Sequence, residues 1–292
     1  MEQATATIGF IGLGAMGGGM CRNVARKHSG PVLAFDMNPA ALAAVTDAGA
    51  QPAGSVAEMA AVADIVLLSL PGGKQVAAVC EDIAAHAKPG TVVIDLSTTS
   101  VAEARAVAAR LAQAAMHFAD APVARARAAA EAGTLSIMVG ASEALFARIA
   151  PVLGYMGSDV TRCGEVGCGQ VVKLVNNTLL FEHVAALAEM MVVSERAGVA
   201  PQTLLEVLSI SSADSFALRN HGMKAMLPRA FPEKAFPSPY VVKDMGYALE
   251  MAADAGVSAR MAEQALGYYR EAIEAGIGEQ YFPAIIELVD RK

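Results

Sequence analysis

The glycine-rich run over 12–17 constrains the fold of this chain more than any other feature. It follows a short apolar segment, 7–11, that is typical of a buried parallel strand, and Met16, Met20 and Val24 then recur every four residues, as on one face of a helix. In such a strand–turn–helix the first glycine permits a tight turn, the second lets the backbone approach a pyrophosphate, and the third lets the helix pack on the strand. The N–H groups at the helix start favour the phosphates. We therefore predict that a dinucleotide is bound by Gly12, Leu13, Gly14, Ala15, Met16 and Gly17.

Strand-like and helix-like segments alternate through the first half of the chain. Asn38-Pro39 is typical of a helix start, and Ser100 with Glu103 fits a capping box. This alternation predicts a Rossmann-type, doubly wound parallel sheet with right-handed crossovers and helices on both faces. The expected strands are 7–11, 32–35, 65–70, 91–96, 118–123 and 135–139.

The second half offers no comparable strands. The segment Val166–Ala197 is apolar nearly all round, so a helix there has to be covered on several sides. Further helical segments are expected from Pro201, from about Phe216, over 240–255 and over 258–275, and the last two end before Gly256 and Gly276. The sequence therefore predicts an α/β fold with a Rossmann-type nucleotide domain over 1–163 and an all-helical substrate and dimerisation domain over 164–292. We expect a homodimer or homotetramer, with the long helix and the C-terminal helices at the interface.

Composition excludes several other classes of protein. The 292 residues are 54% hydrophobic, which excludes intrinsic disorder, and the net charge of −7 argues against a nucleic-acid partner. Charged residues or glycines interrupt every apolar stretch, so we predict no membrane span. The four scattered cysteines predict neither a disulfide scaffold nor a metal site. Because Glu2 stands where a secretory signal carries basic residues, we expect a cytoplasmic protein.

Asp36 indicates which dinucleotide is bound. It ends the second expected strand, nineteen residues beyond Gly17. A carboxylate at this place accepts hydrogen bonds from the adenosine ribose and repels a 2′-phosphate. The next residues, Met37-Asn38-Pro39, offer no Lys or Arg for such a phosphate. We therefore predict NAD as the cofactor, in preference to NADP.

The fingerprint over 9–17, with Met20 and Asn23 beyond it, resembles that of the β-hydroxyacid dehydrogenases, which include 3-hydroxyisobutyrate dehydrogenase. The resemblance extends along essentially the whole chain. It implies a cofactor-side turn at Leu70-Pro71, a strand end beneath the nicotinamide at Thr98, a substrate loop after Asp120, a catalytic helix over 173–177, and C-terminal cofactor contacts at Phe236 and Lys243.

The catalytic helix also makes chemical sense. Lys173 and Asn177 are four residues apart, on one helical face, with Asn176 beside them. Hydride transfer between an alcohol and NAD needs a group that removes or supplies the hydroxyl proton, and a lysine can do this. Asn177 can orient the hydroxyl or the ammonium. From the residues alone a surface lysine is an equal alternative; the resemblance favours Lys173 and Asn177 as catalytic residues and Asn176 as a substrate contact.

The substrate loop departs from the family pattern. Commoner members have Asp-x-Pro-Val-Ser-Gly-Gly, whose backbone N–H groups hold the substrate carboxylate, whereas here Ala124, Arg125 and Ala126 follow Pro122-Val123. The sulfolactaldehyde reductase branch has a related arginine, which meets a sulfonate. We expect Ala124, Arg125 and Ala126 to contact the substrate, with the Arg125 guanidinium holding its acidic group. Arg127 would face the other way if the strand continued.

Together these features predict an NAD-dependent dehydrogenase or reductase of a small, anionic hydroxy acid or its semialdehyde. A reductase of a sulfonated or otherwise strongly anionic C3–C4 aldehyde is one alternative. An imine reductase and a non-catalytic cofactor-binding protein are others, and Lys173 counts against both.

Overall fold

A computed structural model describes residues 5–233 and 235–291 and divides into two compact units, residues 1–173 and 174–292. The division lies inside the long helix, whereas the sequence placed the boundary before it. Glu2, on which the expectation about secretion partly depends, lies outside the described residues.

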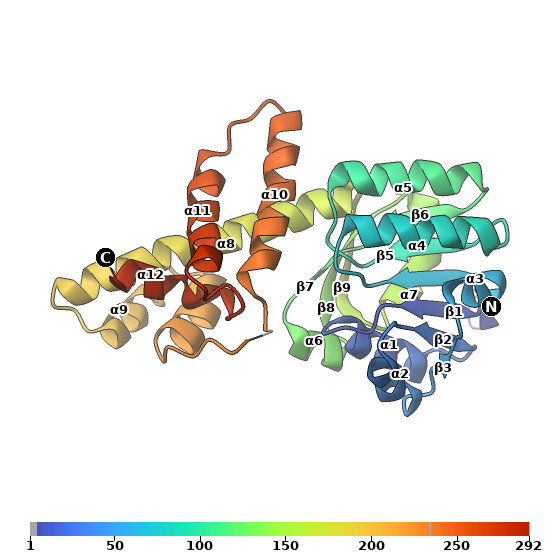
Figure 1. The fold of residues 1–292 in the computed structure, drawn as a ribbon, viewed down its shortest axis with the longest axis horizontal. Helices are drawn as coiled ribbons and strands as arrows, with labels where there is room; N and C mark the ends of the chain where they lie inside the picture. The colour runs from blue at the N-terminus through green and yellow to red at the C-terminus, as the bar shows by residue number, and fades with distance from the viewer. Residues whose placement is uncertain (1–4, 234, 292) are drawn as a thin grey trace. The chain divides into compact units, whose positions relative to one another are not determined.

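The first unit is built on a nine-stranded sheet with the order β3-β2-β1-β4-β5-β6-β8-β7, in which β9 pairs with β8 (Figure 1). The strands from β3 to β6 are parallel, as predicted, and so is the pair β8–β9, whereas β8 is antiparallel to β6 and β7. The strands are β1 (Ile8–Ile11), β2 (Val32–Phe35), β3 (Gln51–Pro52), β4 (Ile65–Leu68), β5 (Val92–Asp95), β6 (His117–Asp120), β7 (Val123–Ala124), β8 (Leu135–Gly140) and β9 (Gly157–Gly164).

Helices cover both faces of this sheet. Ile8 and Phe10 of β1 enter one apolar cluster and Ile11 enters the other, because successive side chains of a strand point to opposite faces. Helices α1, α6 and α7 pack on the first face, and α3, α4 and α5 on the second. The helices of this unit are α1 (Gly17–Lys27), α2 (Pro39–Thr46), α3 (Val56–Val62), α4 (Gly73–His86), α5 (Val101–Gln113), α6 (Arg127–Ala132) and α7 (Glu143–Leu153).

The predicted helix starts are present. The Asn38 side chain accepts a hydrogen bond from the Ala40 N–H at 3.0 Å, and Ser100 with Glu103 forms a complete capping box. The one expected strand over 118–123 is wrong, since it is two strands, β6 and β7, interrupted at Ala121-Pro122. Proline has no N–H for the ladder, so the chain leaves β6 there and turns back along β8.

The second unit is all-helical over its described residues. Its core gathers around Phe181, Tyr269 and Phe282, whose rings meet at centroid distances of 5.3–6.2 Å. Helices α10 and α11 pack against each other. The elements are α8 (Cys168–Arg196), which begins in the first unit, α9 (Pro201–Leu208), the π-helix η2 (Leu218–Met226), α10 (Ser238–Asp254), α11 (Arg260–Glu274), the 3₁₀-helix η3 (Phe282–Ile285) and α12 (Ile286–Arg291).

By length and composition alone, α8 could cross a membrane, which differs from the expectation that charges and glycines interrupt every such stretch. Two of its polar side chains are bonded to other helices: Asn177 donates to Asp244 at 2.7 Å, and Glu189 accepts from the Tyr268 hydroxyl. These are the contacts of a central helix in a helical domain.

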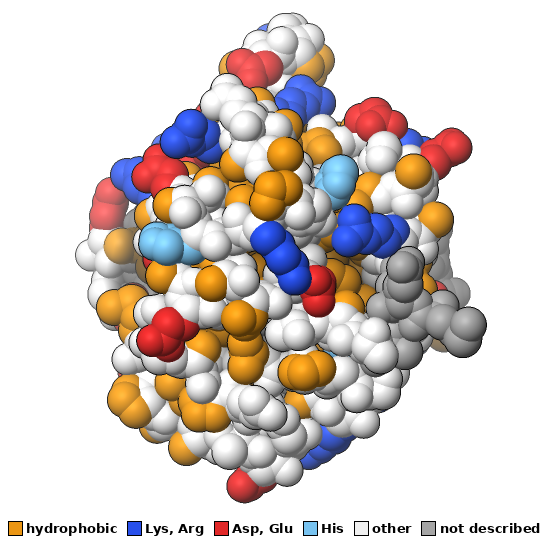
Figure 2. All heavy atoms as spheres, turned by 90° about the vertical axis from the view of Figure 1, so that its right-hand side faces the viewer, with side chains coloured by type: hydrophobic (Ala, Val, Ile, Leu, Met, Phe, Trp, Pro, Cys, Tyr) orange, Lys and Arg blue, Asp and Glu red, His pale blue; other side chains and the backbone are white. Residues whose placement is uncertain are grey.

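On the face drawn in Figure 2, basic and acidic side chains are interspersed.

Candidate active site

The glycine-rich loop adopts the tight turn that the motif predicts. Gly12 has φ of +91°, and a Cβ there would lie 2.2 Å from the Ser69 carbonyl oxygen. A Cβ on Gly17 would lie 2.0 Å from the Gly12 carbonyl oxygen, whereas one on Gly14 would meet nothing within 4 Å. The first and third glycines are therefore required by the fold itself. The open space beside Gly14 is where a bound pyrophosphate would approach the backbone.

Asp36 is fixed beside this loop. Its Oδ2 accepts a hydrogen bond from the Leu13 N–H at 2.6 Å, and its Oδ1 accepts one from the Asn38 N–H at 2.8 Å. Each carboxylate oxygen can accept a further bond. The carboxylate thus stands at the end of β2, bonded directly to the glycine-rich loop, and keeps the capacity to accept ribose hydroxyls. These residues fit an adenine dinucleotide.

The ends of β4 and β5 are tied together next to the dinucleotide loop. The Leu70 N–H donates to the Ser97 hydroxyl at 2.8 Å, and the Ser97 N–H donates to Asp95 at 2.9 Å. The predicted cofactor residues Leu70, Pro71 and Thr98 therefore lie at the carboxyl ends of neighbouring parallel strands. Ligands of open α/β sheets bind at these ends.

The first turn of α8 is anchored to the ends of β5 and β6. Asp120 is fully buried, and its two oxygens accept the N–H groups of Gly167 at 2.7 Å and Gln170 at 2.9 Å. The Gln170 side chain, also fully buried, donates to the Ser97 carbonyl at 2.8 Å and accepts from the Thr99 N–H at 3.2 Å. Burial raises the pKa of the Asp120 carboxyl, while the backbone N–H groups around it favour its charged form.

This anchor positions Lys173. Residues three apart on a helix share a face, so Lys173 lies on the side of α8 from which Gln170 reaches Ser97. Lys173 is half-buried. Sequence reasoning missed Gln170, although the small residues Gly167, Cys168 and Gly169 before it mark a helix start that packs closely.

Asn177 heads a chain of polar contacts in the helical unit. Its Nδ2 donates to Asp244 at 2.7 Å, and its Oδ1 accepts from the Asn176 side chain at 3.1 Å. Lys243 pairs with the same Asp244 at 3.1 Å. Asn177 is buried and Asn176 is exposed, so these polar contacts extend from the interior of this unit to its surface. Asp244 was not predicted as a partner of Asn177, because a contact between α8 and α10 leaves no spacing signal.

Phe236, predicted as a cofactor contact, belongs to the aromatic core of the helical unit. Its ring lies 5.9 Å from that of Phe282 and 5.7 Å from that of Tyr240, centroid to centroid. It is only half-buried. Any cofactor contact would therefore use the exposed part of its ring.

The substrate loop holds Arg125 in an unexpected setting. Its φ is +82°, and its guanidinium donates to the Thr134 carbonyl, to the Ser158 hydroxyl at 3.0 Å and to Asp159 at 2.8 Å. The expectation was a guanidinium directed at the substrate, whereas here it is bonded to the protein. The strand on which the expectation for Arg127 depended ends at Ala124, and Arg127 begins α6 instead.

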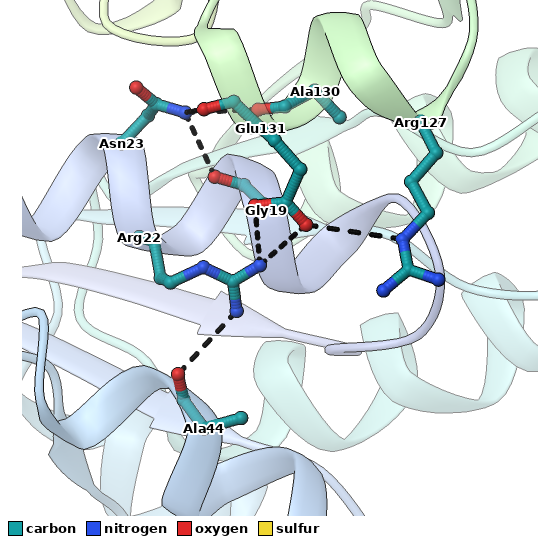
Figure 3. A network of polar contacts seen from close by, with 7 residues as sticks. All are labelled: Gly19, Arg22, Asn23, Ala44, Arg127, Ala130 and Glu131. Atoms are coloured by element: carbon teal, nitrogen blue, oxygen red, sulfur yellow. Dashed lines mark hydrogen bonds and ion pairs between the residues drawn. The ribbon is translucent and has the colours of Figure 1, made fainter.

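Helix α6, which follows the substrate loop, is fastened to α1 (Figure 3). The Asn23 amide donates to the Ala130 and Glu131 carbonyls at 2.9 and 3.0 Å. Glu131 pairs with Arg22 at 2.6 Å and, more loosely, with Arg127 at 4.0 Å. The helix that begins at the dinucleotide loop and the helix that ends the substrate loop therefore form one assembly. Among residues 5–233 and 235–291, no three His, Cys, Asp or Glu side chains are grouped as metal ligands.

Comparisons with known proteins agree with this geometry. A family model described as the NAD binding domain of 6-phosphogluconate dehydrogenase matches residues 7–164. A second, described as NAD-binding of NADP-dependent 3-hydroxyisobutyrate dehydrogenase, matches residues 167–289. The chain is 37% identical to 2-(hydroxymethyl)glutarate dehydrogenase of Eubacterium barkeri, over 98% of this chain and 95% of that one.

Two 3-hydroxyisobutyrate dehydrogenases are also similar. The mitochondrial enzyme of Homo sapiens is 32% identical, over 97% of this chain and 86% of its own. The solved structure of the Mycobacterium tuberculosis enzyme with L-serine has a TM-score of 0.90 at 32% identity and covers 98% of this chain and 99% of its own.

Fold and site together define an oxidoreductase that uses a nicotinamide dinucleotide and acts on CH–OH groups. The two family models and the full-length relatives make the assignment narrower. The chain belongs to the β-hydroxyacid dehydrogenase family, and it is an NAD(P)-dependent hydroxyacid dehydrogenase that acts on a small molecule. The predicted family and fold class are confirmed; the kinship to the sulfolactaldehyde reductase branch stays a prediction.

The close seating of α8 can be tested at Gly169. A Cβ there would lie 2.3 Å from the Met138 carbonyl oxygen and 2.8 Å from Asp120. We expect Gly169→Ala to lower the free energy of unfolding by about 1–3 kcal/mol, because the backbone would have to shift. In the control, Gly246→Ala on α10, the added Cβ meets nothing within 4 Å. Helix propensity should make that variant neutral or more stable. Equal urea-unfolding midpoints for the two variants would contradict the close seating.

Proposed function

We propose that this chain is an NAD-preferring dehydrogenase of a small, anionic hydroxy acid, with Lys173 as its general acid and base. The observation that carries the proposal is the anchor of α8 on the strand ends, which holds Lys173 on the side of the helix that faces Ser97. The predicted cofactor residues Leu70, Pro71 and Thr98 also lie at the carboxyl ends of these strands. A cytoplasmic location is part of the same proposal.

The residues divide the work as follows. A bound nicotinamide would supply the hydride acceptor for oxidation of the alcohol carbon and the hydride donor for reduction of the carbonyl. Lys173 takes the hydroxyl proton as the alcohol is oxidised and supplies it in the reverse direction. Asn177, held by Asp244, presents a fixed amide that orients the hydroxyl or the lysine ammonium. The dinucleotide itself would be held by the glycine-rich loop and by Asp36.

The acid group of the substrate is expected at the loop over 124–126. The relatives named above are dehydrogenases of 3-hydroxyisobutyrate and 2-(hydroxymethyl)glutarate, and both names denote hydroxy acids. The loop of this chain lacks the Ser-Gly-Gly of the commoner members, so a different acid, or a sulfonated C3–C4 aldehyde, is a reasonable substrate. A panel of these compounds, followed at the NADH absorbance band, would identify it.

Cofactor preference can be tested at Asp36. We expect the wild-type protein to have a lower KM for NAD than for NADP, because a 2′-phosphate beside this carboxylate would leave two anions unpaired. Asp36→Ser should narrow the ratio of the two KM values by about tenfold or more, which corresponds to roughly 1.4 kcal/mol. Wild-type protein that used NADP as efficiently as NAD would overturn the role of Asp36.

Proton transfer can be tested at Lys173. We expect Lys173→Ala to lower kcat by about 10²–10⁴-fold while NADH binding, measured by fluorescence titration, is unchanged. Lys224→Ala is the control, since Lys224 is an exposed lysine on η2 that donates to Asn220. Undiminished turnover by Lys173→Ala would remove this residue from the mechanism.

Self-association of the chain into a homodimer or homotetramer can also be tested. Val175, Leu179, Met190 and Val193 are 45–56% exposed within the chain and fall on one face of α8. We expect light scattering at micromolar concentration to give at least twice the chain mass of 30.0 kDa, and Leu179→Lys to lower it. Val62→Lys, at an exposed site at the end of α3 in the first unit, is the control. A wild-type monomer would contradict the proposal.

A further inference from the structure

Arg125 combines a left-handed backbone with a side chain that makes three hydrogen bonds to the protein. Its φ is +82°, a conformation that L-residues other than Asn and Asp seldom adopt. Its guanidinium bonds to three groups on two other segments, Thr134 just before β8, and Ser158 and Asp159 in β9. Because Arg125 belongs to the loop expected to receive the substrate, these bonds tie that loop to the neighbouring strands.

We propose that Arg125 is a positioning residue: paired with Asp159, it holds the substrate loop in a left-handed conformation suited to backbone recognition of the substrate acid. This proposal rests on the proposed function. It replaces the direct contact expected from the sequence with an indirect role. Substrate specificity at this loop would then depend on the Arg125–Asp159 ion pair, and not on the Arg125 guanidinium alone.

The backbone supports this role. The commoner family pattern has glycine where this chain has Arg125, and glycine adopts positive φ at no steric cost. The backbone of this chain is left-handed at Arg125 although the residue is not glycine. A left-handed conformation costs free energy in a residue with a side chain, so other interactions have to offset it. The three hydrogen bonds of the Arg125 guanidinium provide this stabilisation.

The charges support it as well. The guanidinium lies 2.8 Å from Asp159, with the two side chains 44% and 56% exposed. Hydrogen bonds from Ser158 and Arg125 lower the pKa of the Asp159 carboxyl, so the pair is charged at neutral pH. A substrate carboxylate would have to compete with Asp159 for the same guanidinium. The N–H groups of the turn at 125–126 take no part in this pairing.

The two roles of Arg125 predict opposite effects at Asp159. If Arg125 is a positioning residue, Asp159→Asn loosens the loop and raises the KM for the hydroxy acid. If the guanidinium contacts the substrate directly, Asp159→Asn frees it and the KM falls or stays the same. Arg125→Ala raises the KM in both cases, so only the Asp159 variant separates them.

The experiment is a double-mutant cycle on the best substrate found. We expect Asp159→Asn and Arg125→Ala each to raise the KM by about 3- to 10-fold, and the double variant to be no worse than Arg125→Ala. The kcat at saturating substrate and the Kd for NADH should stay at the wild-type values. Asp214→Asn, which breaks another exposed Arg–Asp pair, with Arg219, is the control. A KM that is unchanged or lower in Asp159→Asn would overturn the proposal.

A second readout does not depend on turnover. Amide hydrogen exchange in residues 124–134 should quicken in Asp159→Asn and in Arg125→Ala, but not in the Asp214 control. Unchanged exchange in Asp159→Asn would overturn the positioning role, whether or not a substrate is known. Absence of turnover with every hydroxy acid would instead overturn the proposed function and leave the exchange result to decide the role of Arg125.

Discussion

The buried carboxylate of Asp120 is the group on which the candidate site depends. A buried carboxylate is costly unless hydrogen bonds compensate its lost hydration, and here the N–H groups of Gly167 and Gln170 offset part of that cost. These are the N–H groups that the start of a helix leaves without internal partners. One strand end and one helix start therefore satisfy each other. The Gln170 side chain extends the same network to β5, and Lys173 is placed as a consequence.

A second set of contacts links the glycine-rich loop to the helix that follows the substrate loop. Asp36 bonds to the glycine-rich loop at Leu13, and Asn23 bonds α1 to α6. The Arg22–Glu131 pair adds a charged contact between the same two helices (Figure 3). A conformational change in the dinucleotide loop would thus alter the position of α6, because α1 begins at that loop and is bonded to α6.

Much of the nucleotide-binding half could be predicted from sequence, because its signals are local. Apolar runs of four residues, the caps at Asn38 and Ser100, and three glycines at fixed spacing each reflect the geometry of a short segment. The strand β9 was missed because it is polar and partly exposed at the sheet edge. Its residues, Gly157-Ser158-Asp159, have no apolar alternation to detect.

The contacts that complete the site could not be predicted from the sequence, because they are not local. The pairs Arg125–Asp159 and Asn177–Asp244 join residues 34 and 67 positions apart, and only the tertiary fold brings them together. The sequence singled out Ala124, Arg125 and Ala126 as departures from the family loop. It could not show that Asp159 engages the Arg125 charge, nor that the backbone at Arg125 is left-handed.

The central claim is that the anchor of α8 positions Lys173 for proton transfer, and Gln170→Ala tests it most directly. That variant keeps Lys173 but removes the bonds to Ser97 and Thr99. Gln202→Ala, whose side chain bonds only within α9, is its control. The account predicts a kcat lower by about 10- to 100-fold at saturating NADH and substrate, with a cooperative thermal transition. A kcat equal to that of the control would contradict it.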